Sequence, residues 1–130
     1  EFLDKELAKQ FASLRLWCDN NKHNLIGVNS RRTSNEQMRL MSRCFGSPHM
    51  ITSWHPSHSE PNPYLAILSV ANILVVSADS VGMISEALSL GKPLLLLRPS
   101  KLSAKLNRFV EELVNKKHAL WFSEALTMDD

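Results

Sequence analysis

The sequence predicts an α/β protein with a parallel sheet of about five strands and helices on both faces. Segments with a helical spacing of apolar residues alternate with short strand-like segments along the chain. The runs 73–76 and 94–97 are apolar throughout, which is typical of parallel strands that are buried on both faces. No repeat or low-complexity segment interrupts this order, so we expect a single domain over residues 1–130.

The first part of the chain predicts a helix, a strand and a second helix. Residues 2–19 form the first helix, because their apolar side chains recur at helical spacing. These side chains are Leu3, Leu7, Phe11, Leu14 and Cys18. Residues 25–28 form the first strand. Thr33 and Glu36 have the spacing of a capping box, so the second helix is expected to begin there and to end at Gly46.

The middle of the chain continues the alternation. Residues 50–52 predict the second strand, and the polar, proline-containing stretch 55–61 predicts a loop. A helix over 62–71 begins with Asn-Pro, an N-cap residue followed by proline at the first helical position. The apolar run 73–76 is the third strand.

The last part predicts two more helices and two more strands. A helix is expected over 80–90, where Gly91 is placed to end it, and a strand over 93–97. Ser103 is placed to cap the next helix, and residues 119–122 predict the fifth strand. The apolar face of the helix after Ser103 carries Leu106, Phe109, Val110, Leu113 and Val114.

The composition excludes several classes of protein. The 15 basic and 13 acidic residues leave a net charge of +2, so nothing draws the chain toward nucleic acid or an anionic membrane. Cys18 and Cys44 fit no metal or redox spacing and fall at apolar helix positions, which predicts buried free thiols in a reducing compartment. No apolar run approaches the ~20 residues of a membrane span. Because the chain opens with Glu-Phe rather than Met, we expect a fragment of a longer protein.

Polar residues gather where the predicted strands end. The stretches 29–33, 53–55, 77–80 and 98–100 follow four successive strands and are rich in hydroxyl groups, Arg and Asn. All strands of a parallel sheet end at the same edge, and open α/β sheets bind their ligands outside it. The sequence therefore predicts a binding site at this edge.

The helix after the third strand has two distinct faces. The face expected to pack on the sheet carries Val81, Ile84, Ala87 and Leu88. The opposite stripe carries Asp79, Gly82, Met83 and Glu86. A glycine inside a helix costs about 1 kcal/mol relative to alanine, and close approach of a ligand to the backbone is one reason to keep it.

Two interpretations of this helix remain open. In the first, its free N–H groups bind phosphate and Glu86 binds ribose hydroxyls. In the second, Asp79 or Ser80 simply caps the helix and Glu86 is a solvated surface charge. The charge of Asp79 counts against phosphate at close range.

Other motifs are weaker. Arg31 and Arg32 follow a strand and precede a capped helix, where they either bind phosphate or carboxylate or serve as a solvated charge and an ion-pair partner. The histidines and glutamate of 55–60 have no recognised metal-ligand spacing, so solvated loop side chains are favoured over a metal site. Walker A, G-x-G-x-x-G and G-x-S-x-G patterns do not occur, which removes the main support for P-loop, dehydrogenase and hydrolase functions.

Several short motifs together resemble one known family. They occur in that family's order: Ser30-Arg31-Arg32-Thr33, Asn62-Pro63-Tyr64, Ala78-Asp79-Ser80-Val81 with Met83, Ser85-Glu86-Ala87 and Gly91-Lys92-Pro93. In this combination the chain resembles the mitochondrial fission protein family named for elongated mitochondria, whose bacterial members are often labelled nucleoside-diphosphate-sugar epimerase-like.

The resemblance implies a Rossmann-like three-layer α/β/α domain, the C-terminal half of a GT-B-like fold. In related glycosyltransferases that half binds the nucleotide-sugar donor. The segment 79–93 is similar to their donor-binding helix, which places Asp79, Ser80 and Gly82 near the diphosphate and Glu86 at the ribose. Met83 would also belong to the nucleotide-binding residues. Ser30 would face the cleft on the first loop, with Arg31, Arg32 and Thr33 beside it. The missing N-terminal half normally supplies acceptor contacts and often the catalytic base.

Two functions follow as expectations. The first is a nucleotide-sugar-binding domain of a glycosyltransferase-like protein that needs no metal or other cofactor and is inactive as this isolated half. Its partners would be a nucleoside-diphosphate sugar of unknown base and the missing N-terminal domain. The second is a non-catalytic interaction scaffold with a protein partner in organelle division or membrane-associated assembly, as plant members recruit a dynamin-related protein. An epimerase is disfavoured, because neither a dinucleotide fingerprint nor a Tyr-x-x-x-Lys pair occurs. We expect a cytoplasmic protein, or one peripheral to a membrane or organelle surface.

Overall fold

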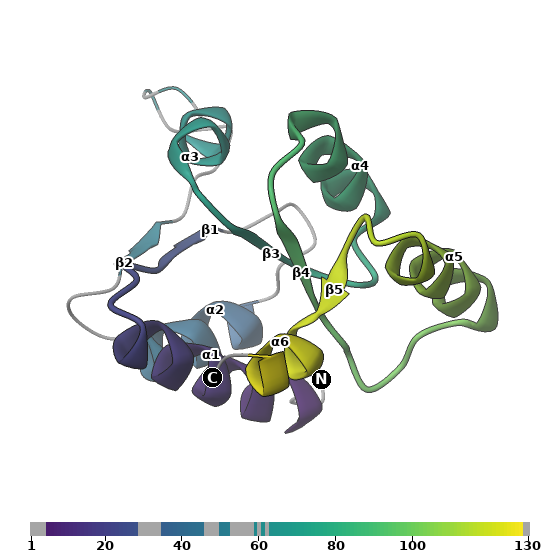
Figure 1. Cartoon of the computed structure of the whole chain (residues 1–130). Helices are drawn as coiled ribbons and strands as arrows, with labels where there is room; N and C mark the ends of the chain where they lie inside the picture. Colours follow the sequence, from purple (N-terminus) through teal and green to yellow (C-terminus); the bar gives the residue numbers. More distant parts are fainter. Residues whose placement is uncertain are drawn as a thin grey trace. The chain divides into compact units, whose positions relative to one another are not determined.

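The computed structural model describes residues 5–28, 35–45, 50–52, 59, 61 and 63–128. The chain divides into two compact units, residues 1–70 and 71–130, and each is described by itself. Figure 1 labels the helices and strands of both units.

The first unit contains three helices and two strands in its described part. In chain order they are α1 (Lys5–Asn20), β1 (Ile26–Val28), α2 (Asn35–Cys44), β2 (Met50–Thr52) and α3 (Tyr64–Val70). The strands β1 and β2 pair in parallel, with Ile26 opposite Met50 and Val28 opposite Thr52. The helix α2 lies between them in the chain, so the three elements form a β-α-β unit.

The core of the first unit includes the contact between α1 and α2. The predicted apolar face of α1 is buried at Leu7, Phe11, Leu14 and Cys18. Phe11 meets Phe45, just past α2, edge to face with 5.4 Å between the ring centroids. This arrangement suits the quadrupoles of two aromatic rings.

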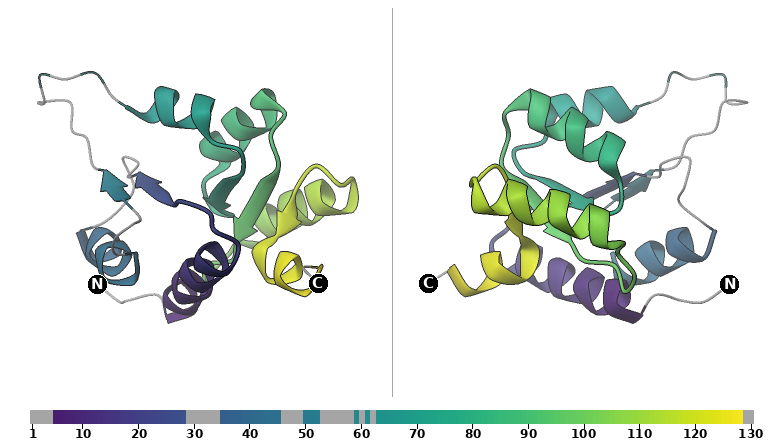
Figure 2. Two further views of the ribbon diagram at one scale, coloured as in Figure 1. Left: turned by 60° about the vertical axis from the view of Figure 1, so that its left-hand side comes forward. Right: turned by 90° about the vertical axis from the view of Figure 1, so that its right-hand side faces the viewer.

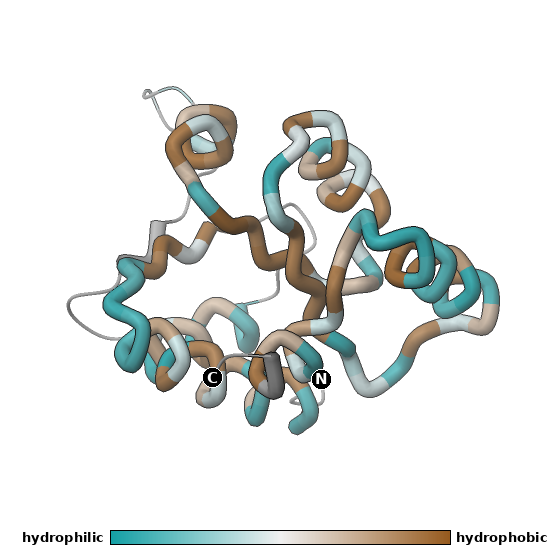
Figure 3. Tube along the Cα trace, in the orientation of Figure 1, coloured by the Kyte–Doolittle hydropathy of each residue, from teal (hydrophilic) through white to brown (hydrophobic). Residues whose placement is uncertain are grey.

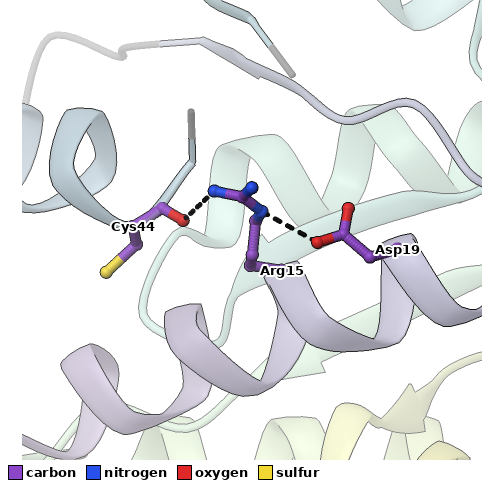
Figure 4. A network of polar contacts seen from close by, with 3 residues as sticks. All are labelled: Arg15, Asp19 and Cys44. Carbon is purple, nitrogen blue, oxygen red and sulfur yellow. Dashed lines mark hydrogen bonds and ion pairs between the residues drawn. The ribbon is translucent and has the colours of Figure 1, made fainter. Parts of the chain in front are cut away.

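A polar contact also joins the two helices. Arg15 of α1 donates from Nη1 to the main-chain oxygen of Cys44 at 3.2 Å, and from Nε to Oδ2 of Asp19 at 3.0 Å (Figure 4). The bond to Cys44 satisfies one of the carbonyl groups that a helix leaves unpaired at its C-terminus. Both cysteines are free, as predicted, but only Cys18 is buried; Cys44 is half-buried, because it lies at the end of α2.

The described part of the second unit contains three strands and three helices. They are β3 (Leu74–Ser77), α4 (Val81–Leu90), β4 (Leu94–Leu97), α5 (Ala104–Asn115), β5 (Leu120–Trp121) and α6 (Phe122–Met128). The strands form a parallel sheet in the order β3-β4-β5, in which Leu74 lies opposite Leu94 and Leu95 opposite Leu120. The helices α4 and α5 lie on the same side of this sheet, as the views of Figure 2 show, and α6 packs against β4 and β5.

The central strand β4 carries the core of the second unit. All four of its leucines, Leu94–Leu97, are buried. Ile84 of α4, Val110 of α5 and Phe122 of α6 are at most 1% exposed. In Figure 3 all of β4 and most of β3 are brown, the colour of hydrophobic residues. A strand that is apolar on both faces is what a parallel sheet covered by helices requires.

The structure confirms the α/β class and places a strand in each of the five predicted segments. The larger sheet nevertheless has three strands rather than about five, since β1 and β2 form a separate two-stranded sheet. A strand's apolar pattern indicates its burial, not its neighbour, so pairing could not be read from the sequence. The fifth strand also ends earlier than predicted: Phe122, expected to close it, begins α6.

Candidate functional site

The turn between β3 and α4 is the part of the predicted site that the structure describes. The Ser80 N–H donates to the main-chain oxygen of Ser77 at 3.0 Å, which closes the turn. The Ala78 N–H donates to the oxygen of Leu97 at 2.9 Å, and Ala78 is fully buried. Two main-chain bonds therefore fix the turn beside the carboxyl end of β4.

Asp79 is held by a neighbour within this turn. The Ser77 hydroxyl donates to Oδ1 of Asp79 at 2.7 Å, and the Asp79 side chain is exposed. Ser77 belongs to the polar stretch 77–80 at the predicted edge, but the sequence predicted no individual role for it. The Ser-x-Asp-Ser sequence at a strand end indicates a turn, because Asp and Ser side chains favour local hydrogen bonds in turns.

The helix α4 begins without a side-chain cap. Ser80 stands at its N-cap position with φ −98° and ψ 76°, and its side chain makes no capping hydrogen bond. Ser103, at the same position of α5, has φ −61° and ψ 155°, and its Oγ accepts from the Leu106 N–H at 3.1 Å. The prediction of a cap by Ser103 is confirmed, and capping of α4 by the Ser80 side chain is wrong. The extended backbone of Ser103 turns its hydroxyl toward the helix, and Ser80 lacks that conformation.

The first main-chain N–H groups of α4 take no part in the hydrogen bonds of the helix itself. The bond from the Ile84 N–H to the Ser80 oxygen, 2.9 Å long, is the first of the helix. No described residue accepts a hydrogen bond from the N–H groups of Val81, Gly82 or Met83. Such groups carry the positive end of the helix dipole and attract anions.

The structure exposes three residues of the predicted outward stripe of α4, whereas the fourth, Met83, is half-buried. Asp79, Gly82 and Glu86 are exposed, whereas Ile84 and Ala87 are buried. A Cβ atom added to Gly82 would meet nothing within 4 Å, so no described part of the chain requires a glycine there. Val81, expected to pack on the sheet, is 39% exposed because it opens the helix at the turn.

Arg98 follows β4 at the same edge of the sheet, but its contacts are made within the fold. Its Nη1 donates to Oδ1 of Asn107 at 3.1 Å, and its Nη2 lies 3.6 Å from Oε2 of Glu111. Its guanidinium carbon lies 3.8 Å from the centroid of the Trp121 ring. These contacts join the end of β4 to α5 and β5.

The other predicted site residues lie outside the described residues. Ser30, Arg31, Arg32 and Thr33 are in this group, as are Asn62 and most of the loop 53–61. Within the described ranges, no three His, Cys, Asp or Glu side chains gather as metal ligands would. None of the described helices combines the length and apolar character that a membrane-spanning helix needs.

The second unit is thus an α/β module with a parallel sheet and an uncapped helix start at a strand-end turn, the kind of module found in Rossmann-like proteins. The profile of the family described as Mitochondrial fission ELM1 matches residues 1–129. The chain belongs to the mitochondrial fission ELM1 family.

Two curated proteins are similar to parts of the chain. The chain is 33% identical over 84 residues to the mitochondrial fission protein ELM1 of Arabidopsis thaliana. The aligned region covers 65% of the chain and 19% of that protein. The chain is 44% identical over 68 residues to the uncharacterized protein RP120 of Rickettsia prowazekii (strain Madrid E). The aligned region covers 52% of the chain and 19% of that protein. The chain therefore spans about a fifth of the length of each relative. No solved structure matches.

Proposed function

We propose that the second unit binds the diphosphate and ribose of a nucleotide sugar at the start of α4, as the donor-binding part of a GT-B-like protein. The observation that supports this most directly is the uncapped N-terminus of α4, which offers the N–H groups of Val81, Gly82 and Met83 at the carboxyl edge of a parallel sheet.

The outward stripe of α4 supplies the remaining groups. The diphosphate approaches the main chain at Gly82, where a missing side chain leaves open space. Glu86 is exposed on the same face and, as an acceptor of two or more hydrogen bonds, binds the ribose hydroxyls.

Asp79 has a different task in this proposal. Its carboxylate would repel the diphosphate, but it suits hydroxyl groups because it accepts hydrogen bonds and donates none. We assign it to a hydroxyl group of the donor sugar, with Ser77 holding the carboxylate in place. Ser80 borders the diphosphate at the same turn.

Charge on the diphosphate is offset by the α4 dipole and by arginine. Arg31 or Arg32, with Ser30 and Thr33 in the same segment of the sequence, is proposed to bind the pyrophosphate or the sugar. This part rests on the family resemblance alone, because these four residues lie outside the described ranges. The scheme uses no metal ion or other cofactor.

The test is calorimetric titration of the folded chain with UDP, GDP, ADP and CMP, repeated with Glu86→Ala. We expect saturable binding of one nucleotide and a loss of roughly tenfold or more in affinity in the variant, since at least one charge-assisted hydrogen bond is removed. Glu112→Ala is the matched control, because Glu112 is an exposed glutamate of α5 in the same unit. Equal nucleotide affinities of wild type and Glu86→Ala would show that Glu86 does not bind the nucleotide.

A second candidate is a binding module in organelle division without catalysis. Two observations favour it: the Arabidopsis thaliana relative is named a mitochondrial fission protein, and α3 has no buried residue among its described side chains. Leu65 and Val70 of that helix are 67% and 71% exposed. If the folded wild-type chain bound none of the four nucleotides in the calorimeter, this candidate would be favoured over the first.

A further inference from the structure

We draw no further inference here: the strongest candidate, the apolar outer surface of α3 at Leu65 and Val70, carries nothing because nothing in the structure shows what covers it.

Discussion

The guanidinium carbon of Arg98 lies 3.8 Å from the centroid of the Trp121 ring. Trp121 is only 5% exposed, and its indole Nε1 points to Oε1 of Glu111 at 3.4 Å. Arg98 also contacts Glu111, so the three side chains bind one another where β4, α5 and β5 meet. Because the Arg98 side chain is 48% exposed, its contact with the ring is expected to contribute about 0.5–1 kcal/mol.

Replacing Arg98 should destabilise the second unit. We expect Arg98→Ala to lower the free energy of unfolding by about 1–2 kcal/mol, since both the ring contact and the bond to Asn107 are lost. Urea unfolding followed by Trp fluorescence and by circular dichroism measures this change. Lys105→Ala, an exposed cation on α5, is the control and should change stability by less than about 0.5 kcal/mol. Equal stabilities of the two variants would contradict a structural role for Arg98.

The two N-cap serines should respond differently to substitution. Ser103→Ala removes the hydrogen bond to the Leu106 N–H and should cost about 1 kcal/mol. Ser80→Ala removes no capping bond and should change the free energy of unfolding by less than about 0.5 kcal/mol. Thermal unfolding of both variants by circular dichroism tests the contrast. A larger loss for Ser80→Ala would show that its hydroxyl caps α4 in solution.

Gly82→Ala separates folding from binding. The added methyl group meets no described atom within 4 Å, so the fold should gain roughly 0.5–1 kcal/mol from the better helix former. If the diphosphate approaches the backbone at this point, the same methyl group should lower nucleotide affinity about tenfold, or about 1.4 kcal/mol. Denaturation and calorimetry on one sample give both values. A stabilised variant that binds nucleotide as tightly as wild type would exclude Gly82 from the site.

Stability should depend on pH through Cys18. Burial raises the pKa of this thiol, and the neighbouring Asp19 carboxylate adds to the rise. Above the ordinary thiol pKa of about 8.5, the unfolded chain loses a proton that the folded chain retains. The protonated Cys18 thiol therefore makes its full contribution to the free energy of unfolding below that pH. This contribution is lost as the pH rises through the pKa of the thiol in the folded state.

Replacing Cys18 tests whether its thiol causes this pH dependence of stability. Urea unfolding between about pH 7.5 and 10 should show a smaller fall in stability for Cys18→Ala than for wild type, whatever the two proteins' absolute stabilities. Parallel slopes for wild type and Cys18→Ala would refute the argument.

The element types were largely predictable because local signals and tertiary packing agree. The end of α4 is an example: Gly91 has φ +67°, and its N–H donates to the Leu88 oxygen, as a left-handed helix end requires. Ser103 is another, since an N-cap serine before an apolar helical pattern is a strong local signal. The apolar run 94–97 indicated a strand that is buried on both faces, and it is the centre of the three-stranded sheet.

The features that the sequence did not reveal depend on long-range or fine geometry. The pairing of strands into separate sheets depends on contacts that no local pattern encodes. The contact of Arg98 with Trp121 joins residues far apart in the chain, and the failure of Ser80 to cap α4 depends on one pair of backbone angles. The helix α6 was missed because Phe122 also fits a short apolar strand.

The buried strand β4 has a consequence for the chain before it folds. Four consecutive leucines form a segment prone to self-association whenever they are exposed, as they are until β3, β5 and α6 pack against them. Lys92-Pro93 precedes the run and Arg98-Pro99 follows it, so a positive charge and a proline stand at each end. Such residues act as gatekeepers that disfavour stacking of the same segment from several chains. Arg98 would thus protect the chain twice: its charge opposes aggregation of the unfolded state, and its contact with Trp121 stabilises the folded one.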